Sequence, residues 1–297
     1  MHDEILFVAA PESDGSHPDR RGRRTELAAT RDLNTLPAMN RPVPKALLLA
    51  VIVGGACARA SGAASNNASI IDSAFAKWRV TGAFALLKKS KDGSWQEVVS
   101  GPAAAQRLLP ASTFKIANTL IGLETGAIRE DEVFKWDGQP RALPAWEKDL
   151  TLAEAIKVSC VPCYQDVARR IGPDRMKAWL SKIGYGNAEV GAVVDRFWLD
   201  GPMAISPKEQ VQFVRRLYEE QLPVARRHQR FVKRILFTEE VDGYRLFAKT
   251  GWGQALTPQV GWYVGWVESK KSVYVFATLV RVPKSQQKLM ATVRKDL

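Results

Sequence analysis

A serine and a lysine stand three residues apart in the segment Ser112-Thr113-Phe114-Lys115, at the start of an apolar stretch. The apolar residues that follow recur at helical spacing, which predicts a buried helix with both side chains on one face. A serine hydroxyl is a useful nucleophile only when a nearby base takes its proton. The positive end of a helix also favours the negative charge that develops during acyl transfer. The segment therefore indicates Ser112 as a nucleophile and Lys115 as its base.

The rest of the chain offers few other groups for hydrolytic chemistry. It has three histidines, two in a polar N-terminal stretch and one in a basic run (His2, His17 and His228). A Ser-His-Asp triad therefore has almost no candidate base. The three cysteines do not provide a metal-ligand pattern, and no glycine-rich phosphate loop follows a strand. We expect no metal and no organic cofactor.

The composition is that of an ordinary globular protein. The chain has 297 residues, of which 46% are hydrophobic and 25% are charged, and its net charge is +12. The basic residues are scattered, and the one dense run, at 226–234, has apolar residues at the spacing of an amphipathic surface helix. We therefore interpret the positive charge as a solvated surface and expect no nucleic-acid partner.

The N-terminal region has the layout of a targeting sequence. Residues 1–38 are polar and lack periodicity, whereas 39–63 run from basic residues through a short apolar segment to small residues, as in a signal peptide. We expect Met39 to be the true start, 1–38 to be a non-native or disordered extension, and 64–297 to be the catalytic domain. Cys57 leaves a lipoprotein anchor as the less favoured alternative. The apolar segment is too short to span a bilayer, so we expect a periplasmic protein without stable membrane insertion.

The pattern of elements predicts a mixed α/β (α+β) fold. Capping boxes at Thr151 and Ser206 begin two helices of a long helical middle that starts at Ser112. We expect a five-stranded antiparallel sheet with terminal helices on one face and the inserted helical subdomain on the other. The expected strands are 81–89, 94–100, 244–250, 259–267 and 272–282, and the terminal helices are 70–80 and 286–295.

Further motifs follow Ser112 in a fixed order. They are Ser159-Cys160-Val161, Tyr185-Gly186-Asn187, Phe197-Trp198-Leu199 and Lys249-Thr250-Gly251-Trp252. Over residues 68–297 this set resembles the class D (oxacillinase-type) serine β-lactamases, and it implies the β-lactamase/transpeptidase-like fold. S-x-x-K and K-T-G alone are shared with penicillin-binding proteins, but Val161 replaces the asparagine of the other families. We interpret the Tyr185 motif as a structural turn.

The resemblance implies hydrolysis of β-lactam antibiotics, penicillins and cephalosporins among them, and hence antibiotic resistance. Ser112 would form the acyl-enzyme. Burial should lower the pKa of Lys115 and leave it a neutral amine. The resemblance further implies that this amine takes up carbon dioxide, or bicarbonate, as a carbamate that serves as general base in acylation and deacylation. Trp198 would donate a hydrogen bond to the carbamate, and Val161 would keep its surroundings apolar.

Other residues would bind the substrate and move a proton. Ser159 would pass a proton to the leaving β-lactam nitrogen, and the backbone N–H groups of Ser112 and Trp252 would form the oxyanion hole. The K-T-G segment would lie beside the substrate, with its cation and hydroxyl near the substrate carboxylate. That segment comprises Lys249, Thr250 and Gly251.

Two features depart from the pattern of the family. Gln286 stands where an arginine usually binds the substrate carboxylate, and its substitutes would be Arg281, Lys284 or Lys288. In addition, Cys160 and Cys163 form a C-x-x-C motif. We expect two small buried apolar side chains there, with a disulfide as the alternative in an oxidising periplasm.

Two other functions fit parts of the same pattern. A penicillin-sensing receptor domain would share the motifs and acylate without turnover, but such receptors carry several transmembrane segments. A peptidoglycan transpeptidase is disfavoured by Val161. Counting turnovers with nitrocefin would separate an enzyme, which reacts many times, from either alternative, which stops near one.

Overall fold

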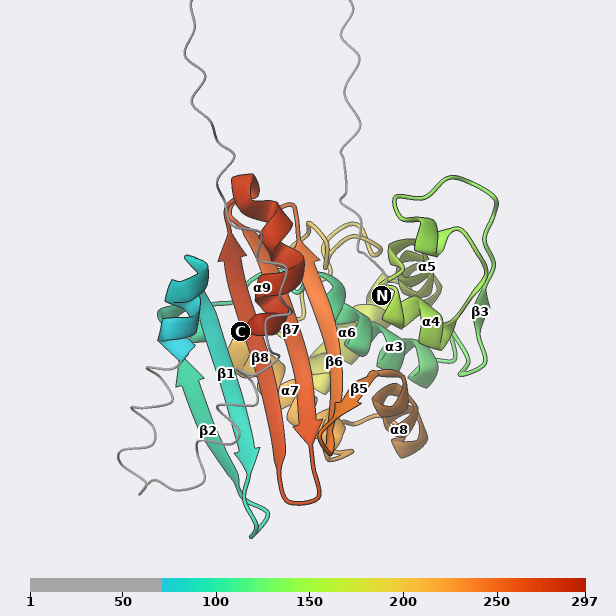
Figure 1. Cartoon of the computed structure of the whole chain (residues 1–297). Helices are drawn as coiled ribbons and strands as arrows, with labels where there is room; N and C mark the ends of the chain where they lie inside the picture. The colour runs from blue at the N-terminus through green and yellow to red at the C-terminus, as the bar shows by residue number, and fades with distance from the viewer. Residues whose placement is uncertain (1–70) are drawn as a thin grey trace, which may run out of the picture.

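The computed structural model describes residues 71–297, and Figure 1 shows a central sheet covered by helices on both faces. The expectations for the extension at 1–38, for the signal peptide at 39–63 and for Cys57 lie outside the described residues. Between residues 71 and 297, no helix combines the length and the apolar character that crossing a bilayer requires.

The sheet has six antiparallel strands in the order β2-β1-β8-β7-β6-β5. The first hairpin turns at the Lys91-Asp92-Gly93 segment, where Gly93 has a φ of 85° and the Asp92 carboxylate accepts the backbone N–H of Ser94. Five of the strands match the sequence-based expectation closely. The strands are β1 (Thr81–Lys89), β2 (Trp95–Ser100), β5 (Phe237–Val241), β6 (Tyr244–Gly253), β7 (Gln259–Glu268) and β8 (Val273–Val282).

The expectation of five strands is wrong, because β5 forms the sixth. It pairs with the start of β6 at the edge of the sheet, and nearly all of its residues are exposed. A strand that buries neither face shows no alternation of polar and apolar residues, so periodicity does not reveal it. The Asp242-Gly243 pair, a common hairpin turn, was the available signal.

Two apolar clusters lie on opposite faces of the sheet. The helical residues 71–78 and α9 (Met290–Asp296) cover one face, where Phe75 and Met290 are buried with Phe276. The other face packs against α7 (Pro207–Tyr218) and the rest of the helical block. The predicted layers, with terminal helices on one face and the inserted helices on the other, are confirmed.

The helical block positions the motifs that follow Ser112. Both predicted capping boxes are present, with Thr151 beginning α4 and Ser206 beginning α7. The basic run forms α8, whose Phe231 and Val232 are buried, as expected for an amphipathic surface helix. The remaining elements are α3 (Lys115–Glu124), α4 (Leu152–Lys157), α5 (Val161–Ile171), α6 (Pro173–Ile183), α8 (Arg226–Ile235), β3 (Val133–Phe134), β4 (Leu150–Thr151), η1 (Pro102–Ala105), η2 (Ala111–Phe114), η3 (Pro144–Trp146) and η4 (Lys284–Leu289).

Candidate active site

The serine and lysine of the first motif lie together at the start of the buried helix α3. Ser112 stands on the 3-10 turn η2, which runs directly into α3 at Lys115. The Nζ of Lys115 lies 2.8 Å from the Oγ of Ser112, at hydrogen-bond distance. The three-residue spacing thus produces the predicted contact between a hydroxyl and an amine.

Lys115 has no accessible surface, and no carboxylate within residues 71–297 forms an ion pair with it. Its Nζ lies 5.4 Å from the centre of the Tyr164 ring. Burial, and then the positive charge of Lys249, hold the pKa of Lys115 well below the ordinary lysine value of 10.5. The neutral amine is therefore favoured, and a neutral amine can accept the proton of Ser112.

Aromatic rings form one wall beside this pair. Phe114 stacks on Trp198, with ring centroids 5.2 Å apart, and meets Phe197 edge-on at 4.9 Å. The Trp198 side chain is fully buried, and its Nε1–H has no acceptor among the described residues. Because a buried donor without an acceptor is costly, this indole provides a place for an additional acceptor.

A second serine and lysine come together from distant parts of the chain. Ser159 lies between α4 and α5 with a φ of 58°, a left-handed conformation that costs a non-glycine residue about 1–2 kcal/mol. Lys249, on β6, donates from Nζ to the Oγ of Ser159 at 2.9 Å and to the carbonyl of Thr250 at 3.1 Å. Lys249 is also buried, and its positive charge acts on Lys115 of the first pair.

The K-T-G segment packs closely against the turn that carries Ser112. A Cβ added at Gly251 would lie 2.9 Å from the carbonyl oxygen of Pro110 and 3.0 Å from the Cγ2 of Thr113, so no larger residue fits. Thr113 is itself fixed, because its hydroxyl donates to the Pro110 carbonyl at 2.7 Å and accepts from Gln210 at 2.9 Å. The glycine thus allows strand β6 to approach the Ser112 turn.

The other predicted site residues make contacts that mainly support the fold. Val161 is the first residue of α5 and packs, partly buried, against the core. Trp252, the residue after the K-T-G segment, donates from Nε1 to Gln259 at 3.1 Å. Asn187 bonds to the backbone of residues 202 and 204, which supports the interpretation of its motif as a structural turn.

The structure identifies a buried arginine that the sequence analysis missed. Arg294, on α9, is 3% exposed and donates from Nη1 to the carbonyl of Gly251 at 3.2 Å. By contrast, Gln286 is exposed, and Arg281 bonds to Gln106. The helical spacing of Met290 and Val293 could have shown that position 294 lies near the buried side of the terminal helix. The expected substitutes Lys284 and Lys288 are both exposed.

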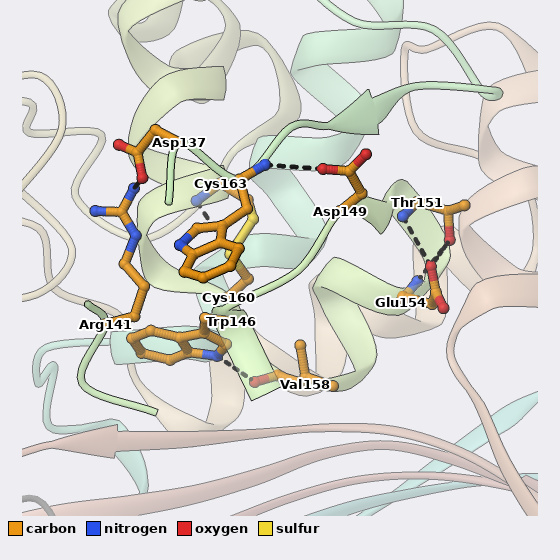
Figure 2. The surroundings of a disulfide bond; sticks show 10 residues. Asp137, Arg141, Trp146, Asp149, Thr151, Glu154, Val158, Cys160 and Cys163 are labelled. Carbon is orange, nitrogen blue, oxygen red and sulfur yellow. Dashed lines mark hydrogen bonds and ion pairs between the residues drawn. A yellow bond between two sulfur atoms is a disulfide. The ribbon is translucent and has the colours of Figure 1, made fainter. Parts of the chain in front are cut away.

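The expectation of two separate buried cysteines is wrong, because Cys160 and Cys163 form a disulfide (Figure 2). Cys160 is the N-cap of α5, and its Sγ accepts the backbone N–H of Cys163 at 3.2 Å. The helical turn brings the two Cα atoms within 5.5 Å, a separation that a disulfide spans. Elsewhere in residues 71–297, no group of three or more His, Cys, Asp or Glu side chains is arranged to hold a metal ion.

The fold and the site first define a broad class of protein. Residues 81–297 match the family model of the penicillin-binding protein transpeptidase domain. This class acylates a serine in an S-x-x-K motif, and it includes penicillin-binding proteins as well as serine β-lactamases.

The comparisons with individual proteins narrow this class. The chain is 45% identical over 207 residues to β-lactamase OXA-5 of Pseudomonas aeruginosa, which covers 68% of this chain and 77% of that protein. It is 46% identical over 183 residues to β-lactamase OXA-48 of Klebsiella pneumoniae, covering 61% and 69% of the two chains. The crystal structure of FUS-1 (OXA-85), a class D β-lactamase from Fusobacterium nucleatum subsp. polymorphum, aligns with a TM-score of 0.71 at 37% identity over 77% of this chain and 94% of that one. The chain belongs to the class D β-lactamases, and the resemblance drawn from its motifs is confirmed.

Proposed function

We propose that this protein hydrolyses β-lactam antibiotics through an acyl-enzyme on Ser112 and thereby confers resistance. The observation that carries this proposal is the 2.8 Å contact between the Ser112 hydroxyl and a fully buried Lys115. The lowered pKa of Lys115 supports its role as the group that takes the serine proton. Penicillins and cephalosporins are the substrates expected from the family, and carbon dioxide or bicarbonate would be needed to carboxylate Lys115.

The surroundings of Lys115 also fit its carboxylation. Only a neutral amine combines with carbon dioxide, and burial favours that form. The resulting carbamate would supply the general base for both acylation and deacylation. Trp198 would donate its unpartnered Nε1–H to it, while the apolar side chain of Val161 would add no competing polar group.

Ser159 and Lys249 would serve the leaving group. When the β-lactam amide opens, its nitrogen needs a proton, and the Ser159 hydroxyl is a group that can donate one. Lys249, bonded to Ser159 at 2.9 Å, would orient that hydroxyl and favour the negative charge of an approaching carboxylate. The backbone N–H groups of Ser112 and Trp252 would bind the oxyanion of the tetrahedral intermediate.

At the position of Gln286 the family usually carries an arginine that binds the substrate carboxylate. Arg294 would perform part of that role. Its guanidinium supports the Gly251 carbonyl from the side of the terminal helix and adds a positive charge behind the K-T-G segment. Because the guanidinium is buried, it would act on the substrate carboxylate through that segment. Arg294 would therefore be a positioning residue. The uncharged hydroxyl of Thr250 would still contact the substrate carboxylate.

Export to the periplasm completes the proposal. The layout of residues 39–63 supports a cleaved signal peptide, with residues 64–297 as the catalytic domain. Protein recovered from the periplasm should begin between about residues 59 and 64 on N-terminal sequencing, as a small-residue cleavage site predicts. A mature chain that still carries residues 1–38 would contradict this part of the proposal.

The proposal is tested by intact-mass measurement together with a turnover count. Native protein mixed with penicillin should show a transient adduct and hydrolyse many equivalents of nitrocefin. Ser112→Ala should show neither adduct nor turnover. An adduct of equal occupancy on the variant would refute the role of Ser112, whereas a native protein that stops after one turnover would be a penicillin-sensing receptor.

A further inference from the structure

Ser159 occupies a backbone conformation that its own residue type does not favour. Its φ of 58° lies in the left-handed region, which is usual for glycine but not for serine. The residue also lies at the junction of two helices, because α4 ends at Lys157 with Val158 as its C-cap and α5 begins at Val161. Such a conformation persists only when the neighbouring structure holds it in place.

Bonds on both sides of Ser159 restrain this junction. On the N-terminal side, the indole of Trp146 donates from Nε1 to the carbonyl of Val158 at 3.0 Å (Figure 2). On the C-terminal side, Cys160 is joined covalently to Cys163 in the first turn of α5. Only the second restraint is a covalent bond, and it begins at the residue directly after Ser159.

The disulfide is not needed to form the helix that it joins. Helix α5 runs for eleven residues and buries Tyr164, Val167, Ala168 and Ile171 against the core. Packing of such an apolar face is sufficient to stabilise a helix. The bond instead limits the freedom of the Cys160 backbone relative to α5, and hence the range of positions open to the Ser159 hydroxyl.

We propose that the Cys160–Cys163 disulfide positions Ser159 for catalysis by holding its hydroxyl at the Nζ of Lys249. This inference rests on the proposed function, in which Ser159 donates a proton to the leaving nitrogen. The two cysteines are positioning residues, since they act through Ser159. Without the bond, the junction can relax from its left-handed conformation, and the 2.9 Å contact between Ser159 and Lys249 is made less often.

Reduction is one way to remove the restraint. A dithiol reductant breaks the S–S bond, two thiols form on Cys160 and Cys163, and the reductant closes to its own disulfide after giving up two electrons and two protons. Both sulfur atoms belong to nearly buried residues, so reduction should be slow in the folded protein. A variant without the bond therefore gives the cleaner measurement.

The variant Cys160→Ser/Cys163→Ala removes the bond and keeps a good N-cap residue at position 160. We expect its acylation rate constant with penicillin, measured by rapid quenching and intact mass, to fall about ten- to a hundredfold, because small displacements of a catalytic group are costly. Val167→Ala is the matched control. It weakens the packing of the same helix one turn further on and should lower the melting temperature without slowing acylation.

Repeating the comparison in a Ser159→Ala background separates positioning from general loosening. If the disulfide acts through Ser159, its removal should slow acylation no further once that hydroxyl is gone. Full acylation by Cys160→Ser/Cys163→Ala, or an equal loss in both backgrounds, would overturn the inference and leave the proposed function intact. Full activity of Ser159→Ala itself would refute the proposed role of Ser159 and the inference with it.

Discussion

The site contains two serine–lysine pairs that are built in different ways. Ser112 and Lys115 are three residues apart where the 3-10 turn η2 runs into α3, whereas Ser159 and Lys249 are ninety residues apart and come from a helix junction and a strand. Their bond lengths, 2.8 and 2.9 Å, are nearly the same. The pairs differ in what holds them together: the geometry of one helix for the first, and the packing of the whole domain for the second.

This difference indicates a division of chemical tasks. Lys115 is fully buried, and its pKa is lowered by that burial and then by the charge of Lys249. In the proposed mechanism the local pair would provide a base, and the distant pair would provide a positive charge beside it. The two are coupled, because the positive charge of Lys249 makes the protonated form of Lys115 less favourable.

The largest effect should follow from breaking the local pair with Lys115→Met. Loss of a general base lowers turnover by about 10²–10⁴-fold. The variant should at the same time be more stable at pH 7 by about 1–2 kcal/mol, because it removes a buried amine. Nitrocefin turnover and thermal melting in carbon dioxide-free buffer measure the two effects.

The stability gain from Lys115→Met should depend on pH in a defined direction. Because the folded-state pKa of Lys115 is lowered, the unfolded chain binds more protons below 10.5, so the native protein loses stability as pH falls from that value. The advantage of the variant should therefore shrink as pH is raised toward 10.5. An advantage that stays constant over this range would contradict the neutral amine.

The second effect in size should come from breaking the distant pair with Lys249→Met. A hydrogen bond to a charged group contributes about 1.5–3 kcal/mol, so acylation should slow by roughly ten- to a hundredfold. Lys249→Met should also weaken substrate binding and raise KM. Lys249→Arg keeps the positive charge and should recover part of that binding. If Lys249→Met acylates at the native rate, the distant pair has no role in the leaving-group step.

The way in which each pair is built explains how much of it the sequence could predict. Helical spacing alone placed Lys115 against Ser112, because residues i and i+3 share a face in any helix. Nothing local placed Lys249 against Ser159. The resemblance to class D β-lactamases assigned both residues to the site, but their contact was not predicted. Strand periodicity likewise predicted the buried strands but not β5, whose exposed residues follow no burial pattern.

The missed features share a physical reason. Arg294 reaches the carbonyl of Gly251 only because α9 packs over β7, so its role depends on contacts 43 residues apart along the chain. The Cys160–Cys163 bond depends on the direction of two side chains in the first turn of α5, which spacing alone does not decide. Both depend on the direction of side chains in the folded protein, which sequence spacing does not fix.

The environment of the local pair can be tested separately with Trp198→Phe. Phenylalanine keeps a ring against Phe114 and removes only the unpartnered Nε1–H. Deacylation should slow about tenfold, because one hydrogen bond to a charged group is lost. The loss in deacylation rate should grow at acid pH and shrink when bicarbonate is added. Trp266→Phe is the matched control, because the Trp266 ring stacks on Phe247 and carries an equally buried N–H without an acceptor among the described residues. This control should leave the bicarbonate dependence unchanged.

The smallest effect should come from Arg294→Met, which weakens the support of the distant pair. Methionine fills much of the same space beside Gly261 but loses the hydrogen bond to the Gly251 carbonyl and the positive charge behind the K-T-G segment. The KM for penicillin should rise about three- to tenfold with kcat nearly unchanged, since the interaction serves binding more than chemistry. A penicillin methyl ester, which lacks the negative charge, distinguishes the two losses. If Arg294 acts through its charge, the native protein and the variant should handle the ester alike, whereas an equal rise in KM for the acid and the ester would show that the arginine only supports the strand.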